Sequence, residues 1–104
     1  MIEFNIVKRE ADAIVADLSG ELDTAAAQPF ASYLEAFSDD DVKKQITINF
    51  ERLEYISSAG MRILLVLAKR AGANGRKVNL SGMSEDVKQI FQLTGFDNMF
   101  AIQQ

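Results

Sequence analysis

The chain has 104 residues, 48% of them hydrophobic, which is enough for one continuous core in one domain (residues 1–104) and leaves no room for a second. It contains no cysteine and no histidine, which excludes disulfides and thiol nucleophiles and removes the commonest general base and zinc ligand. The net charge is -4 and the Lys and Arg residues are scattered, so we expect no nucleic-acid partner.

The N-terminal sequence MIEFNIVKRE carries neither an export signal nor a membrane segment. It lacks the basic-then-apolar layout of a secretory signal, and no apolar run approaches the ~20 residues that span a bilayer. We therefore expect a cytoplasmic protein without direct membrane insertion. We also expect it to hold no cofactor and no metal.

An N-terminal hairpin is predicted by alternation and by a short link. Residues 2–9 alternate as an edge strand, with Ile2, Phe4 and Ile6 on one face. The link at residues 11–12 is too short for a crossover, so residues 13–18 form an antiparallel second strand. Ser19-Gly20 then allows a bend or a bulge.

The first helix has an open boundary. Asp23 or Thr24 can accept backbone N–H bonds and start a helix that runs to about Phe37. Pro29 lies deep for a start at Thr24, so a start nearer Gln28 stays open. The predicted core face consists of Phe30, Tyr33, Leu34 and Phe37.

The rest of the chain alternates between strands and helices. Residues 38–41 (SDDD) are predicted to be a solvated loop rather than a metal site. The predicted elements that follow are strand 45–50, helix 58–73, strand 77–80, a further helix and strand 100–103. The last helix is capped by Ser84 and ended by Thr94-Gly95. Its predicted core face consists of Val87, Ile90, Phe91 and Leu93. This order implies crossovers and a largely parallel central sheet.

The most informative segment is FERLEYISSAGMR, residues 50–62, in which a strand end and a short turn lead to two serines and a helix. Ser57 or Ser58 can simply cap the helix. A helix N-terminus is also a suitable place for an added phosphate, which brings about 1.5 to 2 negative charges to the surface and can block a partner. Gly60 either lets a partner's backbone approach or accommodates packing on the sheet.

Three segments carry a family resemblance: LSGELDT at residues 18–24, TINFERLEYISSAGMR at 47–62 and VKQIFQLTGF at 87–96. With the order of elements, they resemble the STAS family, specifically the small anti-sigma factor antagonists of bacterial partner-switching systems. The resemblance covers essentially the whole chain. It implies an α/β, STAS-like fold: a mixed central β-sheet with an N-terminal hairpin and helices packed mainly on one side.

The resemblance also implies partners. In that family the unphosphorylated antagonist binds a GHKL-type serine kinase that is the anti-sigma factor. Phosphorylation by that kinase inactivates the antagonist. A PP2C-type phosphatase is a further partner. Ser58 matches the phosphorylated serine and Gly60 the glycine of the motif. Ser57 replaces the usual aspartate and Ala59 the second hydroxyl residue, so Ser57 is either an alternative acceptor or a neutral cap.

We place the partner-binding surface around this helix start. By resemblance it comprises Asp23, Thr24, Ser57, Ser58, Ala59, Gly60, Met61 and Arg62. Helix 58–73 is also more apolar than packing on one sheet requires. Either the flanking helices bury the excess, or part of it is a docking patch rimmed by Arg62, Lys69 and Arg70.

Two other functions compete with this interpretation. A non-phosphorylated STAS subunit of an ABC-type lipid transport complex would use Ser58 as a cap or a contact, and the missing aspartate keeps that alternative open. A hydrolase with Ser58 as nucleophile is disfavoured, because the motif holds no histidine or lysine base and no GxSxG elbow. We therefore expect no enzymatic activity.

Overall fold

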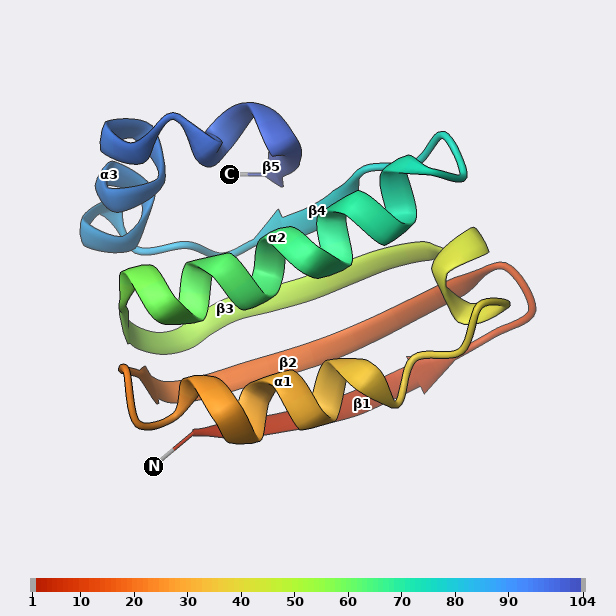
Figure 1. Ribbon diagram of the computed structural model, residues 1–104, viewed down its shortest axis with the longest axis horizontal. Helices are drawn as coiled ribbons and strands as arrows, with labels where there is room; N and C mark the ends of the chain where they lie inside the picture. Colours follow the sequence, from red (N-terminus) through yellow and green to blue (C-terminus); the bar gives the residue numbers. More distant parts are fainter. Residues whose placement is uncertain (1, 104) are drawn as a thin grey trace.

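A computed structural model describes residues 2–103 as one five-stranded sheet with helices packed on it (Figure 1). The elements in chain order are β1 (Glu3–Arg9), β2 (Ala13–Leu22), α1 (Ala27–Glu35), the 3-10 helix η1 (Asp41–Lys43), β3 (Gln45–Ile56), α2 (Ser58–Gly72), β4 (Val78–Ser81), α3 (Glu85–Thr94), the 3-10 helix η2 (Phe96–Met99) and β5 (Phe100–Gln103). The predicted order of strands and helices is confirmed.

The strands lie in the sheet in the same order as in the chain. β1 and β2 form the antiparallel hairpin, and β2, β3, β4 and β5 run parallel to one another. All three crossovers step in the same direction across the sheet, and right-handed crossovers that do so place their helices on one face. Figure 1 shows α1 and α2 lying across that face.

The core lies between this face and the helices. Alternate residues of β2 and β3 point into it, and they are fully or almost fully buried: Ile14, Ala16, Leu18, Ile46, Ile48 and Phe50. Phe91 of α3 packs with its ring centroid 6.2 Å from that of Phe50 and 5.6 Å from that of Phe100. Since Phe50 points to the helical face, α3 lies on that face too, which confirms the predicted one-sided packing.

The opposite face of the sheet is polar. The amide of Asn49 on β3 donates to the carboxylate of Asp17 on β2 at 3.3 Å, and the amide of Asn79 on β4 donates to the hydroxyl of Thr47 at 3.4 Å. Parallel sheets normally need cover on both faces. Here the side chains on the open face bond to one another across the strands, which lets that face stay uncovered by helices.

The boundary of α1 settles nearer Gln28 than Thr24. The helix begins at Ala27, and Pro29 is its third residue, where a missing N–H costs no intrahelical bond. Asp23 forms a turn before it, its carboxylate accepting from the N–H of Ala26 at 2.8 Å. Phe37 lies beyond the helix end but is buried, whereas Tyr33 is 41% exposed.

Two apolar residues lie outside the core that was predicted to hold them. Ile6 is 37% exposed: it lies opposite the buried Ala16, on the core side of the sheet, but β1 is the edge strand, so a neighbouring strand covers it on one side only. Leu93 is 79% exposed on the outer side of α3. Its hydrophobicity, rather than its position in the helical repeat, produced the wrong prediction.

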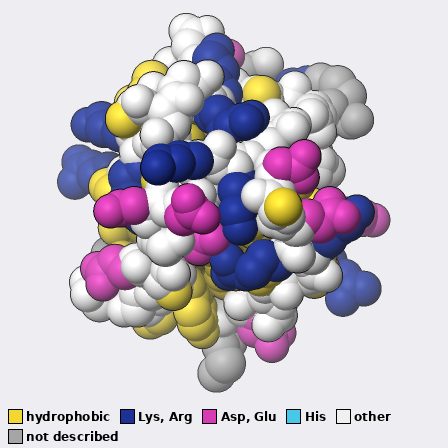
Figure 2. All heavy atoms as spheres, turned by 90° about the vertical axis from the view of Figure 1, so that its right-hand side faces the viewer, with side chains coloured by type: hydrophobic (Ala, Val, Ile, Leu, Met, Phe, Trp, Pro, Cys, Tyr) yellow, Lys and Arg dark blue, Asp and Glu magenta, His cyan; other side chains and the backbone are white. Residues whose placement is uncertain are grey.

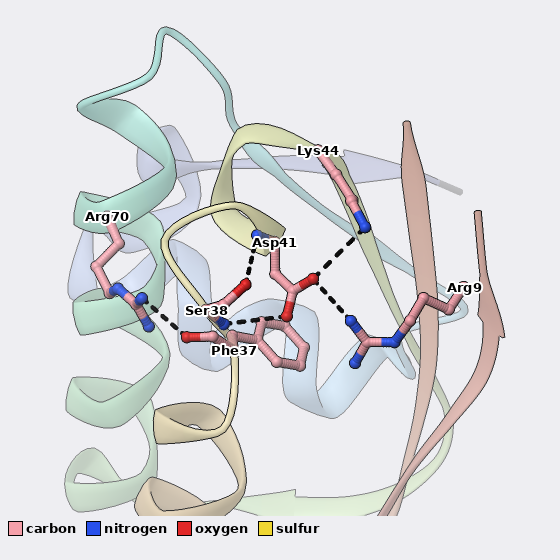
Figure 3. Close-up of polar contacts among 6 residues, drawn as sticks. All are labelled: Arg9, Phe37, Ser38, Asp41, Lys44 and Arg70. Carbon is pink, nitrogen blue, oxygen red and sulfur yellow. Dashed lines mark hydrogen bonds and ion pairs between the residues drawn. The ribbon is translucent and has the colours of Figure 1, made fainter. Parts of the chain in front are cut away.

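Residues 38–40 of the predicted solvated loop are exposed, but Asp41 is a buried carboxylate, which corrects the prediction at that position. Asp41 is 6% exposed and accepts from Arg9 at 2.7 Å, while Lys44 lies 3.5 Å away (Figure 3). Figure 2 shows this end of the molecule, where Lys and Arg side chains gather beside carboxylates. The cluster ties the β1–β2 hairpin to η1.

The charge of Asp41 is held by its neighbours. Burial alone would raise the pKa of this carboxyl, but the N–H of Ser38 and the hydrogen bond and charge of Arg9 outweigh it and lower the pKa from 3.8 to about 2. On the other side of the loop, Arg70 of α2 donates to the carbonyl of Phe37 at 2.9 Å. Both contacts are far from the start of α2.

Candidate partner-binding site

The site forms where β2 and β3 end together. The sequence predicts that β3 ends at Phe50 before a turn. In the structure the strand continues to Ile56, which lies opposite Leu22 of β2. The N–H of Ser57 then donates to the carbonyl of Leu22 at 2.8 Å. Asp23 directly follows β2, and Ser57 directly follows β3 and leads into Ser58, so these residues emerge together at the carboxyl ends of the two strands, where ligands of open α/β sheets usually bind.

Ser57 is the N-cap of α2. Its backbone is extended, with φ -89° and ψ 166°, and its hydroxyl accepts from the N–H of Gly60 at 3.1 Å. The residue is 7% exposed, and its carbonyl accepts the first helical bond, from Met61, at 2.9 Å. Of the two roles left open for the serine pair, capping belongs to Ser57.

Ser58 is the first residue of α2 and is exposed. Within residues 2–103 no hydrogen bond involves its side chain, so its hydroxyl is free to react or to contact a partner. Its position follows directly from the cap: once Ser57 bonds back to Gly60, residue 58 stands at the outer rim of the first turn.

Gly60 serves packing. It is buried, and a Cβ on it would lie 2.4 Å from Cγ and 2.8 Å from Cδ2 of Leu22, both closer than real contacts allow. Met61, the next residue, is 1% exposed and packs in the core. Both were placed on the predicted partner-binding surface, with packing on the sheet as the alternative for Gly60; both are buried and seat α2 against the end of β2.

The exposed part of the predicted surface consists of Asp23, Thr24, Ser58 and Arg62, with Ala59 half-buried beside them. Sequence reasoning missed Tyr55, which is 47% exposed at the end of β3, opposite Glu21. Tyrosine is enriched among residues that dominate binding energy. The signal available was an aromatic residue in the polar stretch ERLEY, which had been assigned to a turn.

The electrostatics of this edge favour an added anion at α2. The first turn of α3 already carries Glu85 and Asp86, whereas the first turn of α2 holds no acidic residue. The unpaired N–H groups and the positive end of the α2 dipole are therefore not complemented by a carboxylate of that turn. Within residues 2–103 there is no cluster of three His, Cys, Asp or Glu side chains that could hold a metal.

The extra apolar surface of α2 is only partly buried. Leu64, Leu67 and Ala68 lie in the core, but Val66 is 58% exposed. It borders an apolar groove of about 230 Å³ between α1 and α2, lined by Ala31, Leu34, Glu35, Ile63, Val66, Leu67 and Arg70. Packing thus buries part of the excess apolar surface, and the docking patch stays a prediction. Among the described residues, none of the helices has the length and apolar character needed to cross a membrane.

Comparison of the sequence with known proteins identifies the family. The family model of the STAS domain matches residues 5–104. A protein of Bordetella bronchiseptica named BtrV, described as a candidate anti-sigma factor antagonist, is 29% identical over 89 residues, which cover 86% of this chain and 76% of that protein.

Solved structures show the fold. The unphosphorylated form of SpoIIAA, titled an anti-sigma factor antagonist, is 23% identical and superposes with a TM-score of 0.73 over 98% of this chain and 88% of the other. The phosphorylated form of SpoIIAA from Bacillus is 24% identical, with a TM-score of 0.70 over 100% of this chain and 92% of the other. The family model covers nearly every residue and the fold agrees with it, so this chain belongs to the STAS domain family.

Proposed function

We propose that this chain is an anti-sigma factor antagonist: unphosphorylated, it binds a GHKL-type kinase that is the anti-sigma factor, and phosphorylation of Ser58 by that kinase switches it off. The observation that carries the proposal is the separation of roles in the serine pair. Ser57 is buried and caps α2, while Ser58 is exposed with no hydrogen bond among the described residues. Precedent comes from SpoIIAA, whose phosphorylated and unphosphorylated forms are both known.

The phosphoryl transfer needs a base from the kinase. A bond forms between Ser58 Oγ and the γ-phosphorus of ATP, the bond from that phosphorus to the bridging oxygen of ADP breaks, and the hydroxyl proton leaves to a base. This chain has no histidine, and the position before the acceptor is a serine. The base and the metal-bound nucleotide are therefore supplied by the partner.

A phosphate on Ser58 changes the surface and leaves the fold intact. The group would sit at the positive end of the α2 dipole, with no acidic residue in the same turn to repel it. It adds about 1.5 to 2 negative charges to the surface, and a partner that fits the unphosphorylated surface would lose affinity because it must desolvate the phosphate or is repelled by it. Binding is lost while the core stays packed.

Ser57 stands where the family usually has an aspartate, and this difference keeps the N-cap but removes a negative charge. Serine and aspartate are both strong N-cap residues, so serine preserves the geometry that an aspartate would give. What disappears is a carboxylate beside the acceptor. This departure is also the one feature that favours a non-phosphorylated STAS subunit of an ABC-type lipid transport complex, in which Ser58 would be a contact residue.

The test incubates the purified protein with a candidate kinase and ATP and measures the intact mass. Wild type and Ser57→Ala should gain one phosphate, whereas Ser58→Ala should gain none. Ser32→Ala, which removes another exposed helical serine, is the matched control and should be labelled like wild type. A PP2C-type phosphatase should then remove the label. Full labelling of Ser58→Ala contradicts the site, and tight binding to a transporter ATPase without labelling by the kinase supports the alternative.

A further inference from the structure

The groove between α1 and α2 is an apolar surface with a positive margin. Val66 borders it at 58% exposure, and Arg62 and Lys69 lie four residues before and three after Val66 on the same side of α2. Both cations are exposed, and within residues 2–103 neither forms an ion pair. Of the charged lining residues, Arg70 is paired with Asp39 at 3.5 Å and Glu35 is outnumbered by Arg62 and Lys69, so the margin carries a net positive charge although the chain is acidic overall.

The outer side of α3 has the opposite character. Leu93, at 79%, is the most exposed of the large apolar side chains in the described part of the chain. Asp86 and Gln89 precede it by seven and four residues and lie on the same side of the helix, and Glu85 is next to Asp86; all three are exposed. α3 therefore presents two carboxylates, Glu85 and Asp86, about two turns before an exposed leucine, and nothing in the proposed switch uses this side of the helix.

An apolar groove flanked by cations matches an exposed leucine preceded by carboxylates, and we infer that the groove of one copy receives α3 of a second copy. Leu93 fills the apolar groove beside Val66. Asp86 then lies about 10 Å away along α3, while Arg62 and Lys69 lie about 6 Å and 5 Å from Val66 along α2. The long side chains of Arg62 and Lys69 bridge the remaining distance. Asp86 therefore meets a cation whether the two helices run parallel or antiparallel.

The contact joins two different surfaces, the groove of one copy and α3 of the other, and this determines how the copies associate. Each copy offers one groove and one α3, so a single contact leaves one of each free. A helix of ten residues buries less than the roughly 800 Å² per partner of a standard interface, so the association is weak and depends on concentration.

Mixing two variants isolates this contact. Val66→Glu blocks the groove and leaves α3 intact, whereas Leu93→Glu blocks α3 and leaves the groove intact. In sedimentation equilibrium up to about 1 mM, wild type should associate, and each variant alone should weaken association at least about tenfold. The mixture should form a one-to-one heterodimer, because the α3 of the first variant enters the groove of the second.

A control variant, a check of folding and a charge reversal complete the experiment. Val7→Glu alters an exposed residue of β1, at 56% exposure, and should associate like wild type. Circular dichroism checks that each variant is folded, and the exposure of all three sites makes retention of the fold the expected result. Charge reversal of Asp86 to Lys should weaken association and be rescued by Arg62→Glu with Lys69→Glu. A monomeric wild type at about 1 mM, or a mixture that stays monomeric, overturns the inference.

Discussion

The side chain of Leu22 occupies the space that a Cβ on Gly60 would need, with Cγ 2.4 Å and Cδ2 2.8 Å from that position. This relationship joins the end of β2 to the first turn of α2. Since Leu22 is fully buried, it cannot swing aside, and the helix can approach the strand only because residue 60 lacks a side chain.

We predict that Gly60→Ala destabilises the fold by about 1–3 kcal/mol, the usual cost of overpacking a core, measured by urea denaturation. Gly72→Ala is the matched control, because a Cβ there meets nothing within 4 Å, and it should be neutral or slightly stabilising. Combined with Leu22→Ala, the Gly60→Ala change should cost less than it does alone. Strictly additive effects would contradict the packing relationship.

The two serines should respond differently to removal of their hydroxyls. Ser57→Ala loses the cap bond to the Gly60 N–H and should lower the free energy of unfolding by about 1 kcal/mol. Ser58→Ala removes an exposed hydroxyl and should change it by no more than about 0.5 kcal/mol. Ser57→Asp should restore the cap. Equal losses at both positions would mean that capping is shared.

A charge at position 58 should separate binding from stability. Ser58→Asp should weaken binding to the kinase, because the exposed rim gains a negative charge, while the thermal transition stays nearly unchanged. Calorimetric titration and thermal unfolding give the two quantities. Ser32→Asp, on the exposed side of α1, controls for the added charge, and a large loss of thermal stability in Ser58→Asp would refute a purely surface effect.

Tyr55 should contribute to partner binding without contributing to the fold. Its side chain is 47% exposed beside the switch, so Tyr55→Ala should change the free energy of unfolding by no more than about 0.5 kcal/mol. Its loss should weaken kinase binding by more than about 1 kcal/mol. Tyr33→Ala is the control, because Tyr33 is similarly exposed, at 41%, on α1. Equal binding by Tyr55→Ala and wild type would place the interface elsewhere.

Acid should weaken the fold through Asp41. Its pKa is lowered to about 2 in the folded protein, so its stabilisation is complete above pH ~5 and is lost as the pH falls through 2. A shift of this size corresponds to something on the order of 2 kcal/mol. Urea midpoints between pH 7 and pH 2 should fall less steeply for Asp41→Asn than for wild type. Parallel curves would show that other carboxylates dominate.

Much of the fold could be predicted because its signals are local. The caps Ser57 and Ser84 and the left-handed Gly95 stand beside the helices that they bound, and the predicted helix at 58–73 ends within one residue of α2. The parallel order of the strands followed from the crossovers alone. The position of the two adjacent serines at a helix start was equally local, while Ser58 as the phosphorylated residue stays a prediction that rests on the family resemblance.

The missed features depend on residues that are distant in sequence. β3 runs on to Ile56 because β2 continues beside it past Gly20, with register shifts that period-two alternation does not reveal. Asp41 is buried because Arg9, 32 residues away, lies against it. The role of Gly60 depends on Leu22 at the end of another strand. Leu93 was assigned to the core on hydrophobicity alone.

Because Ser57 is the cap and Ser58 the proposed acceptor, substitutions at these neighbouring positions should give different genetic phenotypes. Substitutions of Ser58 should behave as regulatory alleles, locking the output on or off at every growth temperature. Substitutions of Ser57 or Gly60 should instead behave as temperature-sensitive alleles, because they loosen the seating of α2 and reduce the folded fraction on warming. A screen at two temperatures would distinguish the two classes at positions 57 and 58.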